Sequence, residues 1–168
     1  MRGDTKLWIR GANGIGKSTL LKTLMGIIPP LSGSFAFHIA ARPAYLEQDL
    51  KFREQDTNAF NYISDCFPRF NQKEIRSQLA RVGIKGEMSL QNVKTMSGGE
   101  QVRIRLLTIM NVTSNILILD EPTNHLDVNA KESLQKAIAD YEGAVILVSH
   151  DKTFAESVCD KTLTLKQL

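Results

Sequence analysis

Cysteine is scarce in this sequence: Cys66 and Cys159 are the only two among 168 residues. Two cysteines give neither a disulfide framework nor a paired-cysteine metal site, which is typical of a reducing cytosol, and we expect both thiols to serve only in packing. Long apolar runs are missing too, because the longest, at residues 116–119 and 144–148, have only the length of β-strands. Residues 1–4 do not have the basic and apolar character of a targeting leader, so we expect none. The sequence therefore predicts a cytoplasmic protein with no direct membrane insertion.

A large excess of charge of one sign is also absent. The 21 lysines and arginines face 18 aspartates and glutamates, which gives a formal charge of +3 and an isoelectric point near 8.9. This balance permits contact with nucleic acid, but basic and acidic residues are interspersed, which favours a solvated surface. With 42% hydrophobic residues, a chain of this length can bury the core of one ordinary globular domain.

A glycine-rich stretch between two regular elements is the most informative feature that is present. An apolar, strand-like run at residues 7–9 precedes it, and a helical run at residues 20–25 follows it. Glycines let successive backbone N–H groups curl around a polyphosphate, and the following helix directs its positive dipole end at the same anion. A lysine there reaches the outer phosphates and a serine reaches a magnesium ion. The sequence therefore predicts a nucleotide-binding loop made of Gly11, Ala12, Asn13, Gly14, Ile15, Gly16, Lys17, Ser18 and Thr19.

Glycine, proline and apolar residues predict the elements that follow this loop. The first helix should end at Gly26, because Pro29 and Pro30 cannot continue it. After it we expect a short strand at residues 35–39, an apolar run at 44–46 and a polar loop at 51–57.

A small helical insert is expected next, followed by a return to strands. Residues 58–67 have helical spacing, and Asn71 with Glu74 forms a capping box that starts a helix through residue 82, closed by Gly83. Beyond residue 110 the pattern changes to strand, helix and strand, expected at residues 116–119, 128–141 and 144–148. This order is typical of an α/β domain with a parallel sheet.

Two carboxylates, Asp120 and Glu121, follow the apolar run at residues 116–119. Ligands of open α/β sheets bind at the carboxyl ends of the strands, which is where these side chains should lie. There Asp120 can hold magnesium through water, and Glu121 can act as general base on the attacking water. The alternative is that the acids merely end a strand before a turn at Pro122.

Ser97, Gly98, Gly99 and Glu100 precede a helical run at residues 101–110. By itself this stretch is a capping box, with serine at the helix start and glutamate three residues later. The two glycines point instead to bare N–H groups that suit an anion presented from outside. Both interpretations stay open on these residues alone.

Three further side chains are candidates with weaker signals. His150 follows the strand expected at residues 144–148, at the same sheet edge as Asp120, and there it can bind a terminal phosphate; a histidine in such a place is more often a capping or surface residue. Gln48 can bridge magnesium and water, although a lone glutamine carries little information. Trp8 lies in the middle of a strand, and we expect it in the core.

Taken in order, these features resemble the nucleotide-binding domain of ATP-binding cassette (ABC) proteins over essentially the whole chain. The resemblance implies an α/β fold, the three-layer P-loop NTPase fold with a mostly parallel sheet and a small helical insert. It implies a RecA-like core at residues 5–50 and 111–168 and a helical subdomain at about 57–110. The antiparallel β subdomain of a complete cassette would be largely missing.

The resemblance also implies ATP and Mg2+ as ligands and a second cassette as partner. The loop at 11–19 would bind ATP, and Ser18, Gln48 and Asp120 would bind the metal. In trans, Ser97, Gly98, Gly99 and Glu100 would contact ATP held by the opposite cassette, and Asp127 would lie at the dimer seam. One chain would thus supply half of each of two composite sites, with catalytic roles for Lys17, Gln48, Glu121 and His150.

The subfamily is indicated by Asn124 and His125, which resemble ABC-F proteins, whereas membrane transporters more often have Ser-Ala there. Glu100, where transporters usually have glutamine, points the same way. ABC-F proteins carry two cassettes and no membrane domain, and many act on ribosomes. Because only about ten residues precede Gly11, we interpret the chain as an N-terminally truncated single cassette, the second of its parent protein.

Other functions compete with this one. One alternative is the ATPase subunit of a membrane transporter, which would be favoured only if a membrane partner binds residues 58–82. DNA-maintenance ATPases also have a Ser-Gly-Gly signature, but they need a long coiled coil between Lys17 and Ser97, and the short interval here argues against them and against DNA binding. A truncated chain that binds nucleotide but neither pairs nor hydrolyses it is a further alternative.

Overall fold

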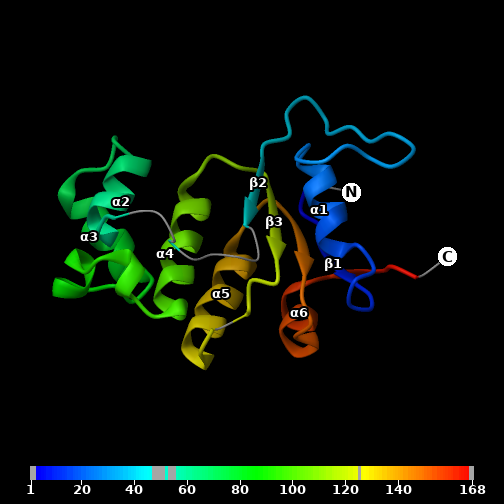
Figure 1. Ribbon diagram of the computed structural model, residues 1–168. Helices are drawn as coiled ribbons and strands as arrows, with labels where there is room; N and C mark the ends of the chain where they lie inside the picture. The colour runs from blue at the N-terminus through cyan, green and yellow to red at the C-terminus, as the bar shows by residue number, and fades with distance from the viewer. Residues whose placement is uncertain (1–2, 47–51, 53–55, 125, 167–168) are drawn as a thin grey trace. The chain divides into compact units, whose positions relative to one another are not determined.

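The computed structural model describes residues 3–46, 52, 56–124 and 126–166. Its chain divides into two compact units (Figure 1). The sheet unit comprises residues 1–48, 113–124 and 135–168, and the helical unit comprises residues 49–112 and 125–134. Helix α5 (Val128–Asp140) begins in the second range of the helical unit and ends in the sheet unit.

The sheet unit is built on five parallel strands in the order β2-β3-β4-β1-β5. Every residue of β4 and nearly every residue of β3 is buried, so both faces of the sheet are covered, as is usual for parallel sheets. Helix α1 (Lys17–Leu24) packs on one face, where Leu21 meets Ile9, Ile118 and Val148. The strands are β1 (Lys6–Arg10), β2 (Pro43–Leu46), β3 (Ile116–Asp120), β4 (Ala144–Val148) and β5 (Lys161–Thr164).

These elements confirm the predicted α/β fold class and most of the predicted ranges. Helix α1 stops before Gly26, whose φ of +71° ends the helix. Trp8 is buried in the core, as expected. Helix α6 (Lys152–Val158) was not predicted, because its seven residues are too few to show a clear apolar period.

The strand predicted at residues 35–39 is wrong. The stretch is irregular, and Ile39 is 99% exposed. Alternating apolar residues suggested a strand, but a strand needs a neighbour for its N–H and C=O groups, and in the described part of the chain none pairs with this stretch. Phe37 instead packs against the apolar cluster of β1 and α1, with Phe35 edge-on to it at 6.2 Å.

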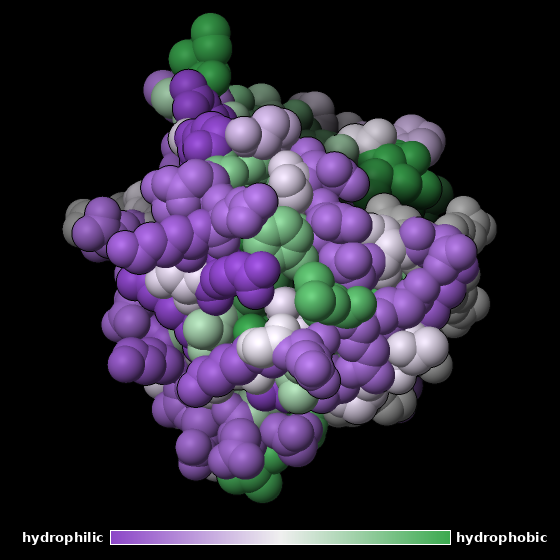
Figure 2. All heavy atoms as spheres, turned by 90° about the vertical axis from the view of Figure 1, so that its left-hand side faces the viewer, coloured by the Kyte–Doolittle hydropathy of each residue, from purple (hydrophilic) through white to green (hydrophobic). Residues whose placement is uncertain are grey.

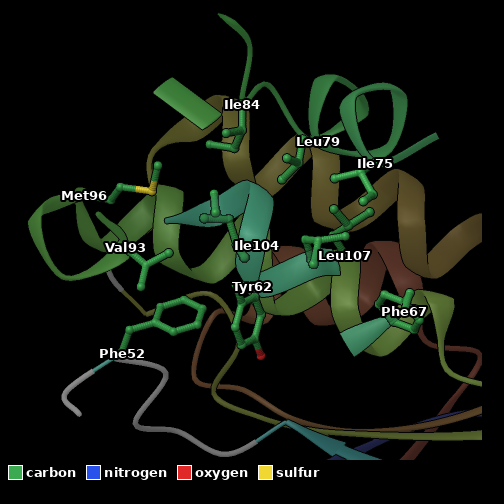
Figure 3. Packing of buried hydrophobic residues seen from close by; sticks show 12 residues of the cluster. Phe52, Tyr62, Phe67, Ile75, Leu79, Ile84, Val93, Met96, Ile104 and Leu107 are labelled. Atoms are coloured by element: carbon green, nitrogen blue, oxygen red, sulfur yellow. The ribbon is translucent and has the colours of Figure 1, made fainter. Parts of the chain in front are cut away.

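The helical unit has its own hydrophobic core (Figure 3). It holds α2 (Ala59–Cys66), α3 (Gln72–Arg81), α4 (Gly98–Asn111) and the 3-10 turns η1 (Gly86–Leu90) and η2 (Val93–Thr95). Apolar side chains from these elements point at one another in Figure 3. The cluster comprises Phe52, Ala59, Tyr62, Ile63, Phe67, Ile75, Leu79, Ile84, Val93, Met96, Ile104 and Leu107.

The start and end signals predicted for helix α3 are confirmed. Asn71 caps α3 in a complete capping box with Glu74, and Gly83 follows with a φ of +81°. The face of the molecule that Figure 2 shows is mostly hydrophilic. In the helical unit, guanidinium groups cover two partly buried rings, Arg76 over Phe60 and Arg69 over Phe70. None of the described helices combines the length and apolar character needed to cross a membrane.

The two cysteines differ. Cys159 is half-buried, and burial, helped by the neighbouring Asp160 charge, raises the pKa of its thiol to about 12, which fits a packing role. Cys66 is exposed at the end of α2, so the expectation that it is a packing residue is wrong. Its place on the last turn of a helix, facing solvent, could not be read from residue type alone.

Candidate functional site

The predicted nucleotide loop connects β1 to α1. Gly16 adopts a φ of +99°, a conformation that strains any residue with a Cβ atom, and it occupies the N-cap position without a side-chain cap. The first N–H groups of α1 are therefore left for an external acceptor. Ser18 lies half-buried in the first turn of this helix.

Lys17 lies under the loop with only 8% of its surface exposed. Its Nζ donates to the carbonyl oxygens of Gly11 at 2.9 Å and Ala12 at 3.0 Å. An ammonium group has three donors, so one remains beyond these two bonds. The loop thus holds a buried positive charge in a fixed place.

Asp120 ends β3 and is buried. Its Oδ1 has no hydrogen-bond partner among the described residues, and its Oδ2 has a long contact of 3.5 Å from the Tyr45 hydroxyl. A buried carboxylate oxygen without a donor is costly unless a cation or water completes it. Asp120 Oδ1 is therefore suited to bind a cation, directly or through a water molecule.

Glu121 has a strained backbone. Its φ of +50° is the one positive value for a residue other than glycine in the part of the chain that the structure describes. Such a conformation costs about 1–3 kcal/mol and is most often found at functional sites. A hydrogen bond of 2.8 Å from its N–H group to the Val148 carbonyl oxygen fixes it beside the end of β4.

His150 meets this glutamate at two points. Its backbone N–H donates to Glu121 Oε2 at 3.1 Å, and its Nε2 lies 3.1 Å from Oε1, an ion pair when the ring is protonated. The Glu121 side chain is buried, whereas 55% of the imidazole surface is exposed. An imidazole placed this way can contact both the carboxylate and a ligand in front of it.

Lys17, Glu121 and His150 line one cleft of about 430 Å³ within the sheet unit, and Asp120 is not among its lining residues. A buried ammonium, helix-start N–H groups, a carboxylate and an imidazole face the same space, which can hold a polyphosphate and a water beside it. Val148 was not predicted as a site residue, because an apolar residue that contributes through its backbone gives no chemical signal. The lining residues are Asn13, Gly14, Gly16, Lys17, Ser18, Thr19, Glu121, Val148 and His150.

The remaining candidates lie elsewhere. Ser97 caps α4 in the helical unit: its Oγ donates to Glu100 Oε2 at 2.9 Å and accepts from the Glu100 N–H at 3.3 Å. The capping box read from the sequence is thus formed, with Gly98 and Gly99 in the first turn of α4. Asp127 is exposed, and its Oδ1 accepts from the Ala130 N–H at the start of α5. Gln48 and His125 lie outside the described residues.

Comparison with known protein families decides the identity of this fold. A family model described as ABC transporter matches residues 1–124, which include the glycine loop, the capping box of α4 and the two carboxylates at the end of β3. The chain belongs to the ABC family. It is an ABC ATPase domain, and such domains bind ATP, typically with Mg2+.

Relatives of the cassette include proteins of subfamily F, which confirms the resemblance to ABC-F proteins. ATP-binding cassette sub-family F member 3 of Mus musculus is 38% identical over 157 residues, 93% of this chain and 22% of that protein. YfmM of Bacillus subtilis, described as an ABC transporter ATP-binding protein, is 41% identical over 162 residues, 96% of this chain and 31% of that protein. The cassette thus spans less than a third of the length of these relatives.

Solved structures confirm the fold. The cassette superimposes with a TM-score of 0.83 on the archaeal ribosome recycling factor aABCE1, solved in complex with the archaeal ribosomal stalk protein aP1. The sequence identity is 25%, over 100% of this chain and 33% of that one. The predicted P-loop ATPase fold is therefore correct.

Proposed function

We propose that the cassette binds Mg-ATP in the cleft described above and hydrolyses it in a composite site that a second cassette completes. One observation carries the proposal: Lys17 and the uncapped N-terminus of α1 line the same cleft as Glu121 and His150. A triphosphate in the loop would place its terminal phosphate toward the carboxylate.

Each side chain then has a defined task. Lys17 neutralises the outer phosphates, Glu121 accepts the proton of the attacking water, and His150 donates a hydrogen bond to the terminal phosphate. The strained backbone of Glu121 supports this role, because it aims the carboxylate into the cleft.

Mg2+ would be held by Ser18, Asp120 and Gln48. Asp120 Oδ1, which has no hydrogen-bond partner within the described part of the chain, supports this choice. The described residues contain no group of three histidine, cysteine, aspartate or glutamate side chains that would bind a metal alone, so phosphate oxygens would complete the coordination. When bound, the metal neutralises phosphate charge.

The domain plan extends this proposal. We assign residues 5–50 and 111–168 to a RecA-like core and residues about 57–110 to a helical subdomain. The sheet unit and the helical unit support the division except at residues 125–134, which group with the helical unit.

Pairing of two cassettes is proposed to bring Ser97, Gly98, Gly99 and Glu100 onto ATP held by the opposite cassette, with Asp127 at the seam. The N–H groups at the start of α4 support this, because Gly98 and Gly99 carry no side chains that would cover them.

Ser97→Arg should leave ATP binding by this chain unchanged but reduce ATP-dependent pairing at least tenfold, because the long side chain would occupy the place of the partner's phosphate. Sedimentation velocity with ATP, in a two-cassette protein or a mixture of cassettes, measures the pairing. Ser97→Ala is the control, since it removes the cap, which costs about 1 kcal/mol, without adding bulk. A Ser97→Arg protein that pairs like Ser97→Ala would leave only the capping role.

The cellular role that we propose is that of an ABC-F protein that acts on ribosomes. Subfamily F relatives and the similarity to an archaeal ribosome recycling factor support it. The sequence feature that resembles ABC-F proteins is the pair Asn124 and His125, which lies between Glu121 and Asp127.

In a two-cassette protein containing this chain, Glu121→Gln should increase the ribosome-bound fraction with ATP by about tenfold, because blocked hydrolysis traps the closed state that a partner selects. Sucrose-gradient sedimentation at low and physiological salt, with and without ATP, measures this fraction. Lys17→Ala in the same protein is the control that cannot bind ATP. Trapped protein found only at the top of the gradient would refute the ribosome assignment and favour a transporter partner.

A further inference from the structure

Trp8 is the one tryptophan of the chain, and its indole reaches the segment that carries His150. Its Nε1 donates to the Ser149 carbonyl oxygen at 3.1 Å, in a buried bond between residues 141 positions apart. In the sheet register Trp8 lies between Leu147 of β4 and Thr162 of β5. The bond therefore ties the middle of β1 to the residue that follows β4.

The carbonyl that Trp8 binds belongs to the peptide group between Ser149 and His150. The N–H group of that same peptide donates to Glu121 Oε2 at 3.1 Å. The described peptide bonds are all trans, so the C=O and N–H of this plane point in opposite directions. The indole and the carboxylate thus hold one rigid plane at its two edges, and rotation of the plane would break both bonds.

The two bonds also reinforce each other. A donor on the carbonyl oxygen polarises the amide and makes its N–H a stronger donor, here toward a charged carboxylate. Glu121 Oε2 is thereby fixed, and Oε1 stays on the His150 side, 3.1 Å from Nε2.

Ser149 is held independently of Trp8. Its Oγ lies 3.2 Å from the Thr123 hydroxyl and accepts from the Asp151 N–H at 3.1 Å, and both hydroxyl side chains are buried. Loss of the indole N–H alone would leave this segment folded and release one edge of the peptide. A purely apolar core position would need the indole rings but not their N–H group.

We propose that Trp8 is a positioning residue: its indole N–H, acting through the Ser149–His150 peptide, orients the Glu121 carboxylate in the nucleotide cleft. The effect on turnover rests on the role proposed above for Glu121 in ATP hydrolysis. The effect on the orientation of the Ser149–His150 peptide does not depend on that role.

A single-atom change tests the proposal. Because the chain has one tryptophan, biosynthetic replacement of tryptophan by 3-benzothienylalanine, with sulfur in place of N–H, alters this hydrogen bond alone. Replacement by 7-azatryptophan, which keeps the N–H, is the matched control. Hydrogen exchange of the His150 amide in this chain should accelerate about tenfold with the sulfur analogue, the order expected for one lost hydrogen bond, and stay unchanged with the control. The Ile146 amide of β4 should keep its rate in both.

ATP turnover is the second readout. In a two-cassette protein that carries tryptophan only at position 8, the sulfur analogue should lower kcat about tenfold and leave KM unchanged. Unchanged His150 exchange, or acceleration spread evenly over β1 and β4, would overturn the proposal, and so would an unchanged kcat. If the tryptophan-containing protein itself does not hydrolyse ATP, the proposed function fails, while His150 exchange still decides whether Trp8 holds the peptide.

Discussion

Lys17→Ala should weaken Mg-ATP binding by about 100-fold or more. The ammonium is the one buried cation that lines the described cleft, and charge-assisted hydrogen bonds to a desolvated phosphate contribute about 1.5–3 kcal/mol each. The substitution also removes the donor for the Gly11 and Ala12 carbonyl oxygens, which loosens the loop that must enclose the phosphates. Calorimetric titration with ATP and magnesium measures the affinity.

Two further variants test whether the charge at position 17 is what binds ATP. Lys17→Met keeps most of the side-chain length and should bind as weakly as the alanine variant. Lys22→Ala, in the same helix but outside the cleft lining, should bind ATP like the unaltered chain. Unchanged affinity in both Lys17 variants would remove the nucleotide-binding role of residues 11–19.

Glu121→Gln should lower the rate of ATP hydrolysis by about 10²–10⁴-fold while ATP stays bound. An amide of the same shape keeps the oxygen that accepts the His150 N–H, so the fold of the cleft is preserved, but it cannot take the proton of the attacking water. Phosphate release in a single turnover, measured in a two-cassette protein, tests this.

Glu156→Gln is the matched control, because that carboxylate lies exposed on α6, near Lys152, and does not line the cleft. It should hydrolyse ATP at the unaltered rate. If Glu121→Gln also hydrolyses at the unaltered rate, another group must accept the proton, and His150 is the first candidate.

Contiguous motifs were predicted from the sequence more reliably than isolated segments. The capping box predicted at Asn71 formed, and so did the one at Ser97, where the sequence had left two interpretations open, because in each box both partners lie within one helical turn. The strand expected at residues 35–39 did not form, because strands depend on neighbours that are distant in sequence. Short helix α6 was missed for the related reason that packing, rather than a long apolar period, stabilises it.

Part of the site could not be seen in the sequence at all. Tyr45 reaches Asp120 across two paired strands, and no spacing rule links residues 75 positions apart. Trp8 could be predicted as a core residue from its place in a strand, but the acceptor of its N–H could not.

By itself, the amino-acid sequence determined the α/β class, the order of the main elements and membership of the ABC family, because each depends on residues that are neighbours along the chain. Only the tertiary structure decided which side chains meet. The parallel sheet places the ends of β3 and β4 side by side, so Glu121 contacts His150, 29 positions away. The pairing of β1 with β4 brings the Trp8 indole to Ser149. Those contacts depend on strand pairing and burial, which fix positions that local sequence leaves open.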